Sequence, residues 1–136
     1  MNPWDDGAVA WSVLIVDDHA GFRTSARALL EADGFDVLGE AADGESAVEE
    51  VRRLRPQVVL LDIQLPGMDG TEALAHLRSL PRTADIPVVA VTAFAMAGDA
   101  ERFKAAGFDG YITKPISVRE FPDQVRGVLT GSQQGG

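Results

Sequence analysis

Apolar and polar residues follow two different periods along this chain. The run PQVVLLD (56–62) places four apolar residues in succession, which is typical of a strand buried on both faces. Between such runs the apolar positions recur every three or four residues, as at Phe22, Ala26, Leu29 and Leu30, which is the period of an amphipathic helix. The pattern predicts strands at 12–16, 35–39, 57–62, 86–91 and 111–112, and helices at 22–30, 44–54, 69–80, 99–106 and 117–129.

Turn-forming and capping residues mark the ends of these elements. Asp33 and Gly34 end the first helix, where glycine suits a left-handed cap, and Asp43 with Gly44 opens the second. The last helix is expected from Ser117 to Leu129, although a proline at 122 weakens its first turns.

Five short strands that alternate with five helices predict one doubly wound α/β domain. Its sheet is parallel and five-stranded, with helices on both faces. We expect an N-terminal extension at residues 1–11, the domain at 12–130 and a disordered tail, GSQQGG, at 131–136.

The composition narrows the class of protein. A chain of 136 residues suits one domain, and its formal net charge of -9 argues against generic nucleic-acid binding. There are no cysteines, which excludes disulfides and thiolate metal sites and is compatible with a reducing cytoplasm. The sequence has no apolar run of the roughly 20 residues that a membrane span requires, and MNPWDDGAVAW does not resemble a signal peptide.

Polar residues of different kinds follow the predicted strands directly or within a few positions. Asp17 and Asp18 follow the first strand, Asp62 the third, Thr92 the fourth and Lys114 the fifth. Ligands of open parallel sheets bind beyond the carboxyl ends of the strands. With strand order 2-1-3-4-5, the first and third strands are neighbours about 5 Å apart. Three carboxylates would then share one crevice.

Such crowding calls for a positive counter-charge. Two like charges 4 Å apart repel by about 4 kcal/mol at an effective dielectric of 20. Mg²⁺ suits a site made of a few carboxylates, waters and a phosphate. Lys114 adds a positive charge and Thr92 a hydroxyl, so the group could bind a phosphoryl oxygen beside a nucleophilic carboxylate.

Each of these residues also has an ordinary structural interpretation. Asp17 and Asp18 could begin the following helix, Asp62 could cap the next turn, Thr92 could bond to the backbone, and Lys114 could be a solvated surface charge. The combination of the required chemical types at four strand ends is what favours a functional site.

Four stretches strongly resemble the receiver domain of two-component response regulators. They are LIVDDH (14–19), VVLLDIQLPGMDG (58–70), VVAVTAFAM (88–96) and GFDGYITKPIS (107–117), and the resemblance extends over about residues 12–130. It implies a flavodoxin-like fold with strand order 2-1-3-4-5.

The resemblance implies a role for each matching residue. Asp62 would accept the phosphoryl group. Asp17 and Asp18 would organise Mg²⁺, for which Mn²⁺ could substitute, with Asp18 and Asp62 as direct ligands and Asp17 acting through water. The backbone carbonyl of Gln64 would add a further ligand.

The remaining matches concern phosphoryl binding and switching. The Thr92 hydroxyl, the Ala93 amide and Lys114 would contact the phosphoryl oxygens, and the Lys114-Pro115 bond would be cis. Tyr111 would move when Thr92 is drawn toward the phosphate, remodelling a protein-binding face; the ordinary alternative is a half-buried strand tyrosine with its hydroxyl in water.

Two variable positions and two histidines complete the expectations. Gln64 and Phe94 flank the site in the family and tune the attack of water on the acyl phosphate, and a bulky Phe94 predicts a comparatively long-lived phosphoryl state. We expect neither His19 nor His76 to take a direct part in the chemistry.

The predicted function is a phosphorylation-activated signalling receiver that takes its phosphoryl group from a histidine kinase or histidine phosphotransfer protein. It would catalyse only its own phosphorylation and dephosphorylation. One alternative is a phosphatase of the aspartyl-phosphate type, which requires a second Asp at the position of Gln64. The other is a non-phosphorylated scaffold receiver.

The implied partners are the phosphodonor protein and a downstream protein effector, without direct binding of nucleic acid or membrane and with cytoplasmic location. The second half resembles hybrid-kinase receivers and single-domain cell-cycle regulators, whereas VDDHAGFR and GEAADGESA resemble receivers that precede DNA-binding domains. Three questions therefore stay open: what the output is, whether this is a single-domain protein or a receiver excised from a longer one, and whether phosphorylation drives dimerisation.

Overall fold

The computed structural model describes residues 10–93 and 98–131, so the predicted flanking residue Phe94 lies outside the described part. Five strands alternate with five helices along these residues, as the apolar pattern predicts. The elements are β1 (Ser12–Val16), α1 (Ala20–Ala32), β2 (Asp36–Ala41), α2 (Gly44–Leu54), β3 (Val58–Asp62), α3 (Gly70–Ser79), β4 (Val88–Thr92), α4 (Asp99–Ala106), β5 (Gly110–Thr113) and α5 (Phe121–Gly131).

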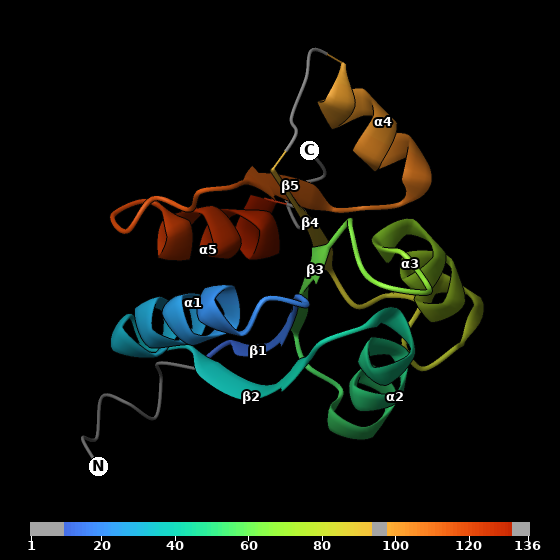
Figure 1. Cartoon of the computed structure of the whole chain (residues 1–136), viewed down its shortest axis with the longest axis horizontal. Coiled ribbons are helices and arrows are strands. Elements are labelled where there is room, and N and C mark those ends of the chain that lie inside the picture. Colours follow the sequence, from blue (N-terminus) through green and yellow to red (C-terminus); the bar gives the residue numbers. More distant parts are fainter. Residues whose placement is uncertain (1–9, 94–97, 132–136) are drawn as a thin grey trace.

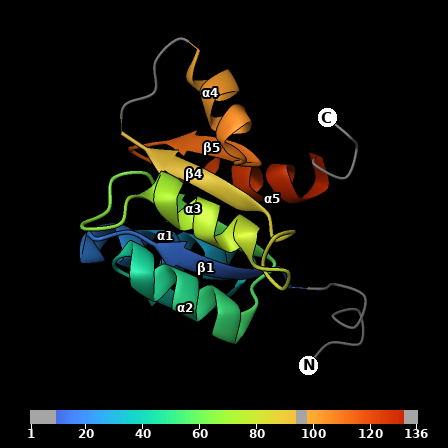
Figure 2. The ribbon, with the colours of Figure 1, turned by 90° about the vertical axis from the view of Figure 1, so that its right-hand side faces the viewer.

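The five strands form one parallel sheet in the order β2-β1-β3-β4-β5. Helices α1 and α5 cover one face, while α2, α3 and α4 lie on the other (Figures 1 and 2). The predicted doubly wound fold and its strand order are therefore confirmed. Every strand points its carboxyl end toward the same edge of the sheet, since all four pairings are parallel.

The central strands are apolar throughout because each of their faces contacts a helical layer. Successive side chains of a strand point to opposite faces. In β3, Val58 and Leu60 belong to the core beside α1 and α5, whereas Val59 and Leu61 belong to the core beside α2, α3 and α4. All four side chains are fully buried. The four-residue apolar run thus contributes two side chains to each face of the sheet, and none of the four is exposed.

The last helix begins later than the sequence pattern predicts. Helix α5 starts at Phe121, and the predicted helical residues before it form turns. Proline has no N–H to donate and is tolerated in the first turn of a helix but not in its interior. The structure accordingly places Pro122 in the first turn. Ser117 Oγ accepts the N–H of Glu120 at 3.2 Å and so stabilises the turn that precedes the helix.

Two glycines permit the close backbone approaches that place the loop after β3. A Cβ atom at Gly70 would lie 2.4 Å from the main-chain oxygen of Asp62, and one at Gly44 would lie 2.6 Å from that of Met68. Contacts this short are essentially excluded for a real side chain. The start of α3 therefore packs directly against the backbone of Asp62, and the start of α2 against the loop that follows it.

Within the described residues, no helix combines the length and the apolar character needed to cross a lipid bilayer.

Candidate functional site

Ladder hydrogen bonds fix the strand ends that carry the predicted site residues. The N–H of Asp17 donates to Ala41 at 3.0 Å, which extends the β1–β2 pairing by one residue beyond β1. The N–H of Lys114 donates to the carbonyl of Thr92 at 2.8 Å and does the same for β5 beside β4. Asp62 is the last residue of β3. The positions of these side chains are therefore set by rigid sheet backbone.

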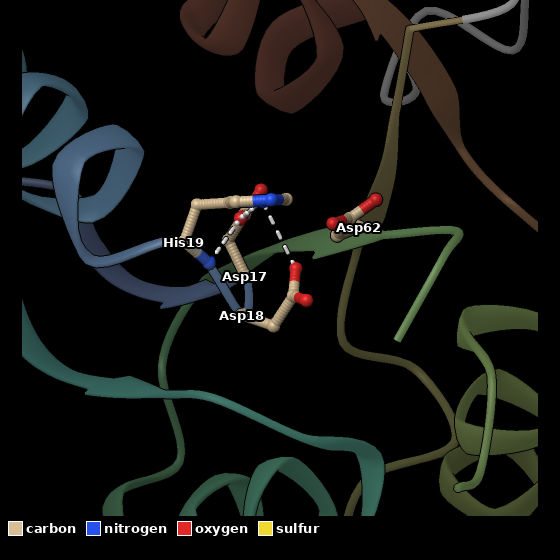
Figure 3. A group of neighbouring side chains, drawn as sticks. All are labelled: Asp17, Asp18, His19 and Asp62. Atoms are coloured by element: carbon tan, nitrogen blue, oxygen red, sulfur yellow. Dashed lines mark hydrogen bonds and ion pairs between the residues drawn. The ribbon is translucent and has the colours of Figure 1, made fainter. Parts of the chain in front are cut away.

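The three predicted carboxylates meet at this edge of the sheet. One ligand atom from each of Asp17, Asp18, His19 and Asp62 lies within 4.8 Å of the others, and the four side chains point toward one another (Figure 3). Asp17 and Asp62 are buried, whereas Asp18 is exposed. Oxygen atoms from two carboxylates in the interior and one at the rim form a donor set of the kind that hard divalent cations prefer.

The structure also brings Lys114 to the carboxylates. Its Nζ lies 2.6 Å from Asp17 Oδ2 and 3.6 Å from Asp62 Oδ2, and its side chain is mostly buried. Two buried carboxylates thus share one mostly buried cation, which leaves the pocket with net negative charge. A further cation or an incoming proton would be attracted to it.

Asp62 is held in a defined orientation by the residue two places along the chain. The main-chain N–H of Gln64 donates to Asp62 Oδ1 at 3.0 Å, so Oδ2 is the oxygen that faces Lys114. Burial raises the pKa of Asp62 above its ordinary value, and the neighbouring charge of Asp17 acts in the same direction. The hydrogen bond from Gln64 and the charge of Lys114 oppose this rise. The carboxylate therefore becomes easier to ionise when a cation joins the site.

The structure does not support the simple helix-start interpretation of the acidic pair. His19 is the N-cap of α1 and makes no capping hydrogen bond with its side chain. Asp17 Oδ1 instead accepts the main-chain N–H of His19 at 2.8 Å, just before the helix. Its second oxygen is turned into the site toward Lys114.

The other predicted site residues lie around the same opening. Asp62, Gln64, Ala93 and Lys114 line one cavity of about 680 Å³ together with apolar residues of α1 and the segment after β5. Thr92 is buried at the end of β4, in register with Thr113. The Lys114-Pro115 peptide bond is cis, as the family resemblance implies.

Tyr111 is separate from this opening. Its side chain is 39% exposed, and its ring lies 5.5 Å from that of Phe103 on α4, measured between centroids. Phe103 in turn packs edge-on against Phe108. The tyrosine thus lies on the outer side of β5, next to α4, where a change in its rotamer would alter an exposed surface.

Four contacts at the site were not anticipated from the sequence. His19 Nδ1 lies 3.2 Å from Asp17 Oδ1 and 3.0 Å from Asp18 Oδ1. The Lys114 ammonium lies 4.5 Å from the centroid of the Phe22 ring, a cation–π contact. Arg23 Nη1 donates to the main-chain oxygen of Asp17 at 2.6 Å.

Arg23 fixes the backbone that carries the acidic pair, and Glu40 on β2 orients it. The Nε of Arg23 donates to Glu40 Oε1 at 2.9 Å, and Nη1 of Arg27 donates to Glu40 Oε2 at 2.7 Å. The hydrogen bond from Arg27, joined by that from Arg23, holds the pKa of Glu40 below its usual range despite burial. The only sequence signal was an arginine five residues after the acidic pair, and its partner Glu40 on β2 was not visible from the sequence.

Comparison with known proteins agrees with this geometry. The family model "Response regulator receiver domain" matches residues 13–126. The chain belongs to the response regulator receiver family. A similar relative is the polar-differentiation response regulator DivK of Brucella anthropi, which is 41% identical over 118 residues that make up 87% of this chain and 95% of the relative.

Solved receiver structures have the same fold. A two-component response regulator of the LuxR family from Aurantimonas sp. SI85-9A1 has a TM-score of 0.82 and 31% identity, covering 90% of this chain and 87% of that one. The receiver domain of sensor histidine kinase PA1611 from Pseudomonas aeruginosa PAO1 has a TM-score of 0.79 and 30% identity, covering 90% and 99%. That structure has a magnesium ion coordinated in its active-site cleft.

Proposed function

We propose that this receiver is switched by transfer of a phosphoryl group to Asp62, with Mg²⁺ as the required cation. The observation that carries the proposal is the cluster formed by Asp17, Asp18 and Asp62 beside Lys114 at the carboxyl edge of the sheet. Membership of the receiver family supports it, and so does the magnesium ion in the similar Pseudomonas aeruginosa domain.

The chemistry of the donor set fits a magnesium ion. Asp18 and Asp62 would hold it directly, Asp17 through water, and the Gln64 carbonyl would complete the protein ligands. When bound, Mg²⁺ supplies positive charge that offsets the negative charge of the phosphoryl oxygens. Mn²⁺, with similar oxygen-ligand preferences, would substitute.

The residues of the chain perform the transfer by orientation and charge. The Gln64 N–H holds one oxygen of Asp62, leaving Oδ2 to attack phosphorus while the bond from phosphorus to the donor's imidazole nitrogen breaks. Lys114 is within reach of Asp62 Oδ2 and would move from Asp17 to the new phosphoryl oxygens. The Thr92 hydroxyl and the Ala93 amide would donate to the same oxygens.

The phosphoryl group would then act as a switch. Movement of Thr92 toward it would let Tyr111 leave its exposed position beside Phe103 and so change the surface formed by α4, β5 and α5. The phosphodonor would be a histidine kinase or histidine phosphotransfer protein, and the reader of the new surface a protein effector, which includes a second copy of the chain. If Phe94 flanks the site as the family resemblance implies, it would slow hydrolysis of the acyl phosphate.

Phosphorylation by a small donor tests the proposal. Acetyl phosphate with Mg²⁺ should add one acid-labile phosphoryl group, detected by intact mass, and EDTA should prevent the addition. Asp62→Asn should show no adduct. Asp85→Asn is the matched control, because Asp85 is an exposed aspartate in the loop before β4, and it should react like the wild type.

Three results would contradict the proposal. They are an adduct that survives in Asp62→Asn, no adduct in the wild type, and steady turnover of a phosphoester. The last would indicate a phosphatase of the aspartyl-phosphate type, for which the amide of Gln64 cannot serve as acid or base. An unmodified wild type would indicate a scaffold receiver.

A further inference from the structure

The imidazole of His19 is part of the carboxylate cluster rather than of the helix that it begins. We propose that His19 Nδ1 is a metal ligand at this site, so that the site binds transition-metal dications such as Zn²⁺ and Co²⁺ through nitrogen as well as Mg²⁺ through oxygen. This inference rests on the proposed metal site formed by Asp17, Asp18 and Asp62.

The separations between donor atoms suit a shared metal ion. Ligands bound at about 2.1 Å to a metal with right-angled coordination lie about 3.0 Å apart. His19 Nδ1 lies 3.2 Å from Asp17 Oδ1 and 3.0 Å from Asp18 Oδ1. An oxygen of Asp62 completes a set in which all four ligand atoms lie within 4.8 Å of one another. The imidazole therefore needs little movement to join Asp18 and Asp62 as a direct ligand of one ion, beside Asp17, which would act through water.

The backbone of His19 fixes the direction from which the ring enters the site. Its N–H is held by Asp17 Oδ1 at 2.8 Å, and its φ and ψ are extended, as expected for an N-cap residue. The ring makes no capping bond to α1. Its side chain is 72% exposed, so Nδ1 faces the carboxylates while the rest of the ring borders solvent (Figure 3). An ion can thus reach the nitrogen from outside.

A nitrogen donor changes the metal preference of an otherwise all-oxygen site. Mg²⁺ binds oxygen and keeps much of its water, so it gains little from an imidazole. Imidazole suits Zn²⁺, Co²⁺ and Ni²⁺, whose affinities for nitrogen sites exceed those of Mn²⁺ or Mg²⁺. Removal of His19 should therefore affect the two classes of ion unequally. If the substitution only disturbed the loop structure, it would instead weaken the binding of both classes of ion equally.

The chain itself makes the experiment simple. It contains two histidines and no cysteine, so His76 on α3 is the only other imidazole. His76 is exposed, and His76→Ala is the matched control. The untagged wild type, His19→Ala and His76→Ala are titrated with Zn²⁺, Co²⁺ and Mg²⁺ by calorimetry, and the ¹⁵N signals of the two rings are followed by NMR.

We expect His19→Ala to weaken Zn²⁺ and Co²⁺ binding by about tenfold or more and Mg²⁺ binding by less than about twofold, since only nitrogen-preferring ions lose a strong ligand. His76→Ala should bind all three ions as the wild type does. In the wild type, Zn²⁺ should shift the Nδ1 signal of His19 and leave that of His76 unchanged.

Two results would overturn the inference about His19. One is equal Zn²⁺ affinity in His19→Ala and the wild type, which would leave His19 as an ion-pair partner of Asp17 and Asp18. The other is an equal loss of Mg²⁺ and Zn²⁺ affinity, which would assign it a purely structural role. Either can occur while Mg²⁺ still supports phosphorylation of Asp62. Absence of Mg²⁺ binding in the wild type would contradict the proposed function as well.

Discussion

Charged side chains lie next to the strands at both the amino and the carboxyl ends of the sheet, but the two groups of charges differ in how many partners they have. At the amino ends of β4 and β5, Arg78 donates to Ala84 and Ile86, at 2.9 and 2.7 Å, and to Gly107 at 2.8 Å. The nitrogen that donates to Gly107, Nη2, also donates to Asp109 Oδ2 at 2.8 Å.

At the carboxyl ends, buried Asp17 and Asp62 share the partly buried Lys114 as their cation. The pKa of Asp62 is raised there, mainly by burial. A charge that has a full set of partners stabilises the fold, whereas carboxylates in excess of their cations are left available for a metal and for chemistry. The difference between the two ends leads to four predictions, given from the largest expected effect to the smallest.

Truncation of Arg78 should produce the largest change in stability. Arg78→Ala removes hydrogen bonds to three main-chain carbonyls and leaves Asp109 without its arginine, so we expect a loss of about 3 kcal/mol in the free energy of unfolding. Urea denaturation measures this loss. Mg²⁺ affinity should be unchanged, because the arginine lies at the opposite end of the sheet.

The control is Arg53→Ala. Arg53 pairs with Glu50 on the surface of α2, and its side chain is 64% exposed, so stability should barely change. If both arginine variants unfold at the same urea concentration, the amino end of the sheet is not held together by Arg78 and the comparison of the two ends fails.

Asp62→Asn should raise stability in EDTA at neutral pH. Burial, with the charges of Asp17 and Asp18, raises the pKa of Asp62 above 3.8, so the ionised carboxylate destabilises the folded state. That penalty is fully present above the folded pKa and absent below the unfolded one. We expect the variant to be more stable by about 1 kcal/mol at pH 7, with the gain disappearing by about pH 3.5.

Mg²⁺ should reverse the order of the two proteins. The ion binds the folded wild type and stabilises it by mass action, whereas the variant has lost a ligand. Melting temperatures of both proteins, with and without Mg²⁺ and at pH 7 and pH 3.5, compare them under all four conditions. If Asp62→Asn is less stable than the wild type in EDTA at pH 7, the carboxylates at the carboxyl end of the sheet do not exceed their cations.

Phe22→Leu should slow phosphorylation by a small donor about fivefold. The ring holds the Lys114 ammonium through a cation–π contact, and such a contact is worth about 1 kcal/mol when partly desolvated. Without the ring, Lys114 spends less time between Asp17 and Asp62, where the phosphoryl oxygens arrive. The measurement is the rate of adduct formation at saturating Mg²⁺.

Two control variants separate this effect from packing. Phe22→Tyr retains the ring face and should react at the wild-type rate. Leu29→Met changes a neighbouring side chain of the same core without touching Lys114, and its rate should also stay unchanged. Equal slowing in all three variants would mean that packing of α1, rather than the ring, sets the rate.

The sequence was sufficient for the features that depend on local pattern and on sheet geometry. Alternation of apolar runs with helical periods gave all ten elements, and the shared edge of parallel strands brought Asp17 and Asp62 together. The predicted start of α5 at Ser117 is wrong, because the helical spacing was extended through Pro122 to residues that precede the helix. The contacts of His19 and Phe22 depend on rotamers and on tertiary neighbours, which no local pattern encodes.

The smallest expected effect concerns Asp43, which lies at the same end of the sheet as Asp62 but has its charge satisfied. Asp43 is the N-cap of α2, and its Oδ1 accepts the N–H of Ser46 at 2.7 Å. That hydrogen bond lowers the pKa of Asp43 below 3.8. The carboxylate therefore contributes stability that is present above the unfolded pKa and is lost as the pH falls through the folded one.

Asparagine caps a helix about as well as aspartate, so Asp43→Asn isolates the charge. We expect it to cost about 0.5 kcal/mol at pH 7, the usual contribution of a carboxylate at a helix N-terminus, and nothing at low pH. The two Asp→Asn changes at this end should thus have opposite signs at pH 7. At pH 3.5 the gain from Asp62→Asn should be nearly gone, whereas the loss from Asp43→Asn should persist until the pH falls below the lowered folded pKa of Asp43. Thermal melts at both pH values test this, and equal signs would mean that position along the sheet, not the balance of partners, decides what a carboxylate does.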